Sequence, residues 1–228
     1  MSVFGQKQDY IWVAGGSNQL IDTTHGGITI DFNQNPVKAY YHYRKLNMFV
    51  CNASICDPRG RLIAYTNGCD IADSNDEIME NGGMINPGYA WQVSCNQNKR
   101  GYASGIQSAL ILALPEHDSI YYLFHKQMKL TTGPVDAFTE KLLYSIIDVR
   151  FNNGLGKVTG KNVAIVNDTL AYGMLIATRQ ANGKDWWLLT PKRNSNTFFR
   201  LWTRPLRSDS RSPAVKGAGL LSKFYSFC

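Results

Sequence analysis

The carboxylates of one short segment are the first group of side chains that could do chemistry. The segment contains five acidic residues: Asp70, Asp73, Asp76, Glu77 and Glu80. A calcium loop places its oxygen ligands at alternating positions, as in D-x-D-x-D-G. The spacing of three residues seen here is instead typical of a solvated acidic loop, so we predict no metal site. If a cation binds at all, Asp70 and Asp73 are the best candidates.

The remaining polar residues do not indicate a catalytic centre. The sequence has neither a G-x-S-x-G motif nor a P-loop, and its four histidines do not pair at metal-ligand spacing. Glycoside hydrolysis needs two carboxyl groups about 5–9 Å apart. Four further carboxylates have no distinctive sequence context: Glu116, Asp118, Glu140 and Asp148. We predict no catalytic residue and no cofactor, and we expect His125 to be a hydrogen-bonded structural residue at a strand end.

Two aromatic residues in a long loop are candidates for ligand binding. Trp91 and Tyr102 fall within residues 84–104, where strand alternation is absent. Exposed aromatic rings on loops of a rigid scaffold can stack on sugars. The alternative is that both rings fold back and cover the core. The candidate binding residues are therefore Trp91, Tyr102, Asp70 and Asp73.

Charge and cysteine content narrow the classes of partner. The net charge is +7, but the basic residues are spread along the chain rather than gathered in a stripe, so we predict no nucleic-acid partner. No apolar stretch reaches the length of about 18 residues that a membrane span needs. The five cysteines form no C-x-x-C pair, and their odd number argues against a fully paired secreted framework. One disulfide within residues 51–95 is left open.

Apolar residues recur mostly with a period of two, which predicts an all-β chain. A low charged fraction of 18% and an aromatic fraction of 12% also suit short strands better than long helices. Strands are expected over residues 10–14, 28–32, 39–43, 48–56, 61–66, 107–114, 120–125, 142–151, 162–166, 174–179, 185–190 and 196–202. Single helical turns are expected over residues 76–82 and 136–143.

Three hairpins in the sequence are alike. Each joins a strand of small residues to a strand of aromatic residues through a tight turn, and Leu62, Tyr121 and Trp186 mark equivalent positions. In a β-propeller the inner strands crowd around the axis while the outer strands fan apart, which favours this distribution of sizes. The sequence thus predicts a β-propeller-like fold with three to four antiparallel four-stranded blades. We expect this propeller to be incomplete, and we prefer it to a β-sandwich.

The expected blades cover residues 10–207. An N-terminal tail over residues 1–9 precedes them, and an irregular C-terminal tail over residues 208–228 follows. The hairpins recur at longer intervals than the roughly 40–50 residues of common blades. We place the excess length in two connections, over residues 68–105 and 126–141.

Seven segments of the chain carry a resemblance to a known family. They run in order through Ile11-Trp12-Val13, NASICDPRGRLIAYTNGCDIADSN, Met79-Glu80-Asn81-Gly82, SALILALP, YYLFH, LYSIIDVRFNNGLGKV and ANGKDWW. Together they cover about residues 10–202. In this order they resemble the N-terminal β-propeller-like region of secreted or cell-surface proteins of Bacteroidota, which usually carry a type IX secretion sorting domain. The chain departs from the family pattern in lacking a signal peptide and further blades.

The resemblance implies a secreted or cell-surface location, with a cytoplasmic location as the alternative because no signal peptide is visible. We expect a non-catalytic propeller module that binds carbohydrate or protein at the cell surface. One alternative is a hydrolase that acts on polysaccharide. Another is a structural or assembly fragment that packs against another chain. An unclosed stack of blades exposes a sheet face, which invites self-association.

Overall fold

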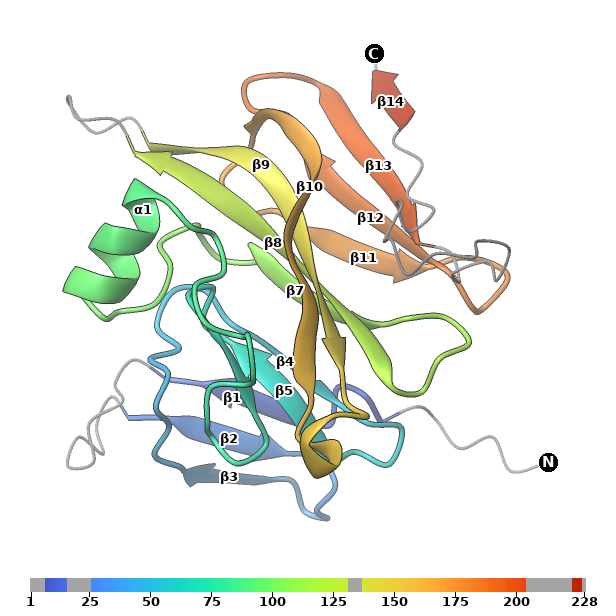
Figure 1. Cartoon of the computed structure of the whole chain (residues 1–228). Coiled ribbons are helices and arrows are strands. Elements are labelled where there is room, and N and C mark those ends of the chain that lie inside the picture. Colours follow the sequence, from blue (N-terminus) through green and yellow to red (C-terminus); the bar gives the residue numbers. More distant parts are fainter. Residues whose placement is uncertain (1–6, 16–25, 131–136, 204–222, 227–228) are drawn as a thin grey trace.

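A computed structural model describes residues 7–15, 26–130, 137–203 and 223–226, which form four antiparallel sheets (Figure 1). In each sheet the strands follow one another in sequence order. Sheet 1 contains β1 (Ile11–Ala14), β2 (Ile28–Asp31) and β3 (Lys38–Tyr41). Sheet 2 contains β4 (Ala53–Cys56), β5 (Leu62–Thr66) and β6 (Ile71–Asp73). Sheet 3 contains β7 (Ala109–Ala113), β8 (Ile120–Leu130), β9 (Ala137–Asp148) and β10 (Lys157–Leu170). Sheet 4 contains β11 (Ile176–Arg179), β12 (Trp186–Pro191), β13 (Thr197–Thr203) and β14 (Lys223–Ser226).

Helical structure is confined to short segments in the described part of the chain. After sheet 2, α1 (Tyr89–Trp91) continues into a π-helical segment over Gln92–Gln97. A 3-10 turn over Asn152–Gly154 connects β9 to β10. None of the helices among the described residues has the length and apolar character needed to cross a membrane.

Neighbouring sheets pack face to face in the order of the sequence. Three clusters of buried apolar side chains join sheet 1 to sheet 2, sheet 2 to sheet 3, and sheet 3 to sheet 4. Their members include Val13 and Tyr65 in the first cluster, Ile55 and Leu123 in the second, and Phe124 and Leu188 in the third. The first strands of the sheets also meet, since β1 contacts β4 and β4 contacts β7. The described residues do not close the stack into a ring.

Strand β8 shows how sheet 3 contacts a sheet on each side. Tyr121 and Leu123 belong to the cluster shared with sheet 2, whereas Tyr122 and Phe124 belong to the cluster shared with sheet 4. Successive side chains of a strand leave opposite faces, so one strand serves both neighbours. Each of the four side chains is at most 2% exposed. Full burial of one large apolar side chain contributes about 1.5–3 kcal/mol, which makes β8 central to the stability of the stack.

The three predicted hairpins are confirmed. They form β4–β5, β7–β8 and β11–β12, the first two strands of sheets 2, 3 and 4. Among the described residues, sheets 3 and 4 have four strands and sheets 1 and 2 have three, so the predicted four-stranded unit is seen in half of the sheets. The all-β prediction is confirmed in this coarser form.

Several predicted segments need correction. Residues 126–141 were expected to be a connection, but β8 and β9 extend into this region and form a long hairpin. The polar residues Lys126 and Gln127 favoured a solvent-exposed connection at this point in the sequence. In the structure both side chains are buried. The helical turn predicted over residues 136–143 is wrong, because residues 137–143 form the first part of β9.

Two further predictions are wrong. Residues 76–82 form no helix, because the segment pairs instead through bridges from Ile78 to Ala72 and from Glu80 to Lys157. The C-terminal segment over residues 208–228 was expected to be irregular, but it contributes β14 to sheet 4. The other residues of that segment, and residues 1–6, lie outside the described part of the chain.

Two buried titratable side chains stand next to each other on β8. His125 is fully buried, with Nδ1 2.7 Å from Asn86 Oδ1 and Nε2 3.0 Å from Ser145 Oγ. This confirms the expected structural role of His125, although it lies in the middle of β8 and not at a strand end. Burial lowers the pKa of His125 to about 3. Lys126 donates through Nζ to the carbonyl oxygen of Ala171 at 2.9 Å, and burial lowers the pKa of Lys126 to about 7.

A disulfide joins Cys69, which follows β5, to Cys95 in the π-helical segment. The sequence left open a disulfide within residues 51–95, and the structure confirms one there. Cys51 and Cys56 are free and buried, and Cys228 lies outside the described residues. The disulfide links positions 26 residues apart, and closing a loop of that length stabilises the fold by about 3–4 kcal/mol through the unfolded state.

We expect the substitution His125→Gln to reduce the sensitivity of folding to acid. From pH 6.5 down to about 3 the unfolded chain protonates this imidazole while the folded chain keeps it neutral. The free energy of unfolding should therefore fall by up to about 1.4 kcal/mol per pH unit in the original protein. Urea unfolding at several pH values measures this slope, with His117→Gln as the matched control. Identical slopes for His125→Gln and the original protein would contradict a neutral buried His125.

We expect a reducing agent to lower the urea midpoint of the original protein. The free energy of unfolding should fall by about 3 kcal/mol, because the reduced chain regains the loop entropy that the disulfide removes. The double variant Cys69→Ser, Cys95→Ser should match the reduced protein and should not respond to the reducing agent. A double variant as stable as the oxidised protein would show that the disulfide contributes nothing.

Candidate functional site

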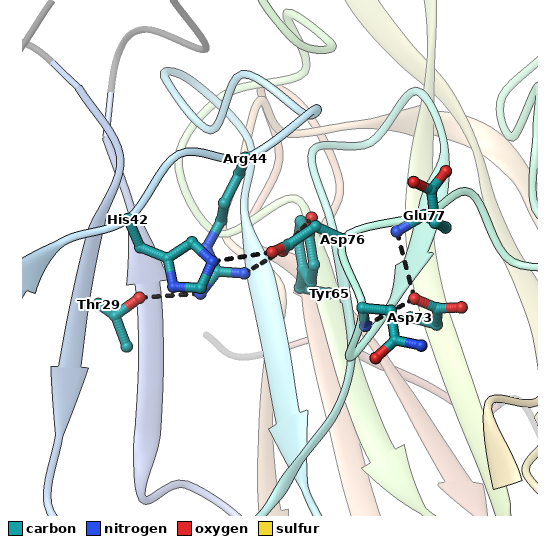
Figure 2. Close-up of polar contacts among 8 residues, drawn as sticks. Thr29, His42, Arg44, Tyr65, Asp73, Asp76 and Glu77 are labelled. Atoms are coloured by element: carbon teal, nitrogen blue, oxygen red, sulfur yellow. Dashed lines mark hydrogen bonds and ion pairs between the residues drawn. The ribbon is translucent and has the colours of Figure 1, made fainter. Parts of the chain in front are cut away.

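Asp70 and Asp73, the two candidate cation ligands, accept hydrogen bonds from backbone N–H groups of the chain itself. Asp70 Oδ1 accepts the backbone N–H of Met84 at 2.8 Å, and burial raises the pKa of Asp70. Asp73 is 5% exposed, and its Oδ1 accepts the backbone N–H groups of Asn75 and Glu77 at 2.8 and 3.2 Å (Figure 2). These bonds fix the loop that follows β6. The carboxylates therefore shape their own segment.

The remaining carboxylates of this segment each face a different cation. Glu77 pairs with Lys45, and Glu80 pairs with Lys157 at 2.6 Å. Within the described ranges, no three side chains of the metal-ligating types come together. The five acidic residues thus diverge to separate partners and do not converge on one point.

Asp76 contacts side chains from β5 and from the segment that follows β3 (Figure 2). Its Oδ2 lies 2.8 Å from His42 Nε2, and its Oδ1 accepts hydrogen bonds from Tyr65 Oη at 2.8 Å and from Arg44 Nη1. Arg44 also donates through Nη2 to Thr29 Oγ1 at 2.8 Å. The Arg44 guanidinium lies over the Tyr65 ring, 5.0 Å from its centroid. We call these five residues the Asp76 cluster.

The Asp76 cluster connects two sheets. Both oxygens of Asp76 accept hydrogen bonds. Burial and the hydrogen bond to Asp76 raise the pKa of Tyr65, so its hydroxyl stays protonated. Arg44 is only 3% exposed, and a buried guanidinium needs a paired carboxylate. The arrangement fits a structural joint between sheets 1 and 2.

The two aromatic candidates fold back onto the core. Tyr102 is fully buried, and its Oη accepts the backbone N–H of Met128 at 2.9 Å. Trp91 is half-buried on α1 and donates through Nε1 to the carbonyl oxygen of Cys69 at 3.2 Å. Both rings pack in one small cluster with Ala90. Both rings therefore fold back and cover the core, which was the stated alternative to exposed stacking.

A cavity of about 400 Å³ lies between the first strands of sheets 2, 3 and 4. Its apolar wall comes from β7 and from the edges of β4, β11 and β12: Ile55, Leu110, Ile111, Leu112, Ala113, Ala177 and Trp186. Polar side chains complete the lining: Gln8, Asp9, Ser54 and Arg179. We call it the first-strand cavity. None of the four candidate residues predicted from the sequence lines it.

A smaller cavity of about 150 Å³ adjoins the first-strand cavity and shares four lining residues with it, Gln8, Ala113, Arg179 and Trp186. It lies at the hairpin turns, so we call it the turn cavity. The turn between β7 and β8 and the turn between β11 and β12 supply most of its polar side chains: Glu116, His117, Asp118 and Lys184. The polar turn cavity thus lies beside the mainly apolar wall of the first-strand cavity.

The side chains at the junction of the two cavities are held in place. The Arg179 guanidinium stacks on the Trp186 ring, 4.6 Å from its centroid, and donates to the carbonyl oxygen of Gly183 at 2.8 Å. Trp186 donates through Nε1 to the carbonyl oxygen of Ala113 at 3.3 Å. In the turn cavity, Lys184 donates to Glu116 at 2.8 Å. An aromatic ring next to fixed polar groups is a common arrangement in ligand sites.

The sequence contained one signal for this cavity. The first strand of each hairpin carries small residues, among them Ser54, Ala113 and Ala177, and all three line the first-strand cavity. Small side chains on facing strands leave space between them. Arg179 and Asp9 gave no signal of their own, because a lone charged residue at a strand end is ordinarily just solvated.

We expect the substitution Asp76→Asn to destabilise the fold by about 3 kcal/mol, because it leaves the buried guanidinium of Arg44 without its counter-ion. The matched control is Glu77→Gln, which removes a solvent-exposed pair with Lys45 and should change stability by less than about 1 kcal/mol. Urea unfolding of both variants measures the difference. Equal effects would show that the Asp76 cluster is no more important than a surface ion pair.

Scans of the chain against family models, curated proteins and solved structures find no match.

Proposed function

We propose that the chain is a β-propeller-like, non-catalytic binding module that holds a carbohydrate or protein ligand in the first-strand cavity. The single observation that carries this proposal is the pairing of the first-strand cavity, of about 400 Å³, with the polar turn cavity beside it. Ligand sites are typically concave, mostly apolar and provided with a few fixed polar groups. The cavity has this composition, with the Arg179–Trp186 stack at its edge.

The arrangement of the sheets supports a propeller-like architecture. Each sheet is a meander, neighbouring sheets pack face to face, and first strands meet. Radial sheets with their first strands near a common axis are the pattern of β-propeller blades. In this proposal sheets 1 to 4 are four consecutive blades of a ring that this stretch of chain leaves incomplete.

A secreted or cell-surface location is supported by two independent observations. The first is the resemblance of the ordered motifs to the Bacteroidota propeller-like region, described above. The second is the disulfide between Cys69 and Cys95, since disulfides persist mainly in oxidising compartments. We therefore place the module outside the cytoplasm.

The hydrolase alternative is favoured by one specific feature. Three carboxylates line the joined cavities, namely Asp9, Glu116 and Asp118. Polysaccharide hydrolysis uses two carboxyl groups on either side of the scissile bond. Glu116 is paired with Lys184 at 2.8 Å, which leaves Asp9 and Asp118 as the groups to test.

A panel of soluble oligosaccharides and peptides, screened by calorimetric titration, tests the proposal. We expect Arg179→Ala and Asp9→Asn each to weaken binding at least tenfold, because each removes a charged group that lines the cavity. The matched control is Trp91→Phe, which alters an aromatic residue away from both cavities and should bind like the original protein.

The outcomes separate the candidate functions. Loss of binding in Trp91→Phe, or unchanged binding in Arg179→Ala and Asp9→Asn, would place the site elsewhere. Release of shortened sugars, abolished by Asp9→Asn or Asp118→Asn, would establish the hydrolase instead. A stable oligomer that binds no member of the panel would favour the assembly role.

A further inference from the structure

Strand β7 is the first strand of sheet 3 and pairs with β8 along one edge only. The hydrogen bonds at its two ends set the alternation: the backbone N–H of Lys126 donates to the carbonyl oxygen of Ser108 at 3.0 Å, and the N–H of Leu114 donates to that of Ile120 at 2.9 Å. In an antiparallel pair, such bonded positions alternate with positions whose N–H and C=O groups point away from the partner strand. The odd-numbered residues of β7 therefore direct their backbone groups to its open edge.

The open edge of β7 faces the first-strand cavity, which is lined by Leu110–Ala113. The carbonyl oxygen of Ala113 accepts the indole N–H of Trp186 at 3.3 Å. Within the described part of the chain, the N–H and C=O groups of Ile111 and the N–H of Ala113 have no hydrogen-bond partner. Ile111 is 4% exposed, and buried backbone groups are normally paired. The cavity wall thus offers two donors and one acceptor of the main chain.

Strand β11 presents a second open edge to the same cavity. The N–H of Gln180 donates to the carbonyl oxygen of Asp185 at 2.9 Å, so by the same alternation the backbone groups of Ala177 point away from β12. The edges of β7 and β11 meet at one end, where the N–H of Leu175 donates to the carbonyl oxygen of Gln107 at 2.8 Å. Among the described strands, no ladder joins β7 and β11 beyond this bond, and the cavity separates them. The cavity therefore lies between two strand edges.

An extended segment of the chain already covers a strand edge beside this cavity. The carbonyl oxygen of Gln8 accepts the backbone N–H of Cys56 at 2.8 Å, and that of Ile11 accepts the hydroxyl of Ser54 at 3.0 Å. Cys56 ends β4, the first strand of sheet 2, and Gln8 and Ser54 line the cavity. The backbone of one extended segment thus bonds to the edge of β4. Among the described residues, no segment does the same for the edge of β7.

We propose that the ligand of the first-strand cavity is an extended polypeptide segment that adds as a strand to the open edge of β7. This inference rests on the proposed binding function and names its ligand class. In strand addition, main-chain hydrogen bonds give affinity, and pockets for alternate side chains give specificity. The segment exchanges two hydrogen bonds with Ile111 and accepts one from the N–H of Ala113. The four residues of β7 that line the cavity match a segment of about four residues, at about 3.3 Å each.

Two features favour a polypeptide over a carbohydrate. The Arg179 guanidinium occupies one face of the Trp186 ring, 4.6 Å from its centroid, and that face is therefore closed to a stacked sugar. The open backbone groups of β7 also recur at every second residue, and the backbone of another strand has the same repeat. Side chains of an added strand alternate between the wall from sheet 2, which includes Ile55, and the wall from sheet 4, which includes Trp186.

A library of soluble eight-residue peptides, acetylated at one end and amidated at the other, is the probe. The full chain selects binders from the library, and the strongest binder is made again with a single N-methyl amide at each position in turn. Calorimetric titration measures each dissociation constant. We expect binding to weaken at least about tenfold where the peptide N–H faces Ile111, and to change little at the two positions beside it, because successive N–H groups of a strand point to opposite edges. Those neighbouring positions are the matched control.

The substitution Ala113→Pro tests the same edge from the protein side. It removes an N–H that points away from β8, so the ladder keeps all its bonds and the variant should fold. Ala113→Val also enlarges the side chain but keeps the N–H. We expect Ala113→Pro to bind the selected peptide at least about tenfold more weakly than Ala113→Val. Circular dichroism melting checks both folds, and the N-methyl series decides alone if Ala113→Pro does not fold.

The results separate strand addition from the binding function on which it rests. If oligosaccharides bind and no peptide does, strand addition is wrong and the binding function stands. The same conclusion follows if N-methyl groups weaken binding equally at all positions or at none, or if folded Ala113→Pro and Ala113→Val bind the peptide equally. If neither oligosaccharides nor peptides bind, the binding function and its peptide ligand are both wrong.

Discussion

Burial of both faces of sheet 3 is the constraint on which the rest of the structure depends. Along β8, alternate large side chains enter the clusters shared with sheet 2 and with sheet 4, so one strand stabilises two interfaces. The same arrangement sets the spacing between the first strands, because the sheets cannot approach more closely than their interleaved aromatic side chains allow. The space left between first strands with small side chains is the cavity where we place the ligand.

The two buried titratable side chains of β8 have specific partners. His125 lies between Asn86 and Ser145, and Lys126 reaches the carbonyl oxygen of Ala171. These bonds connect loops from outside sheet 3 to its central strand, so they order segments that apolar packing alone would leave without a fixed position. The Asp76 cluster does the same between sheets 1 and 2. Buried polar groups of this kind contribute more to a unique arrangement than to stability, because their desolvation offsets much of what their bonds gain.

Much of the fold could be predicted from the sequence, but little of the site. The three hairpins were predictable because small residues, a turn and aromatic residues repeat in that order, and local periodicity carries this signal. The long β8–β9 hairpin was missed because Lys126 and Gln127 look solvent-exposed until the distant segments that bind them are known. The helical segment over residues 89–97 was missed because it is short, has no side-chain cap, and is tied to Cys69 by the disulfide. The cavity forms where several strand ends lie close together. Asp9 and Arg179 both line it but are far apart in the sequence, and local sequence patterns do not indicate such contacts.

The alternation along β8 has a consequence for how proteins with this architecture can diverge. A single inserted or deleted residue in β8 would exchange the side chains offered to the two neighbouring sheets, so the strand cannot change length without losing both interfaces. The hairpin turns have no such restriction, and they supply most of the turn cavity. Changes in length can therefore accumulate at the turn cavity, beside the proposed site. Sequence changes in these turns can alter ligand preference while the stack of sheets stays the same.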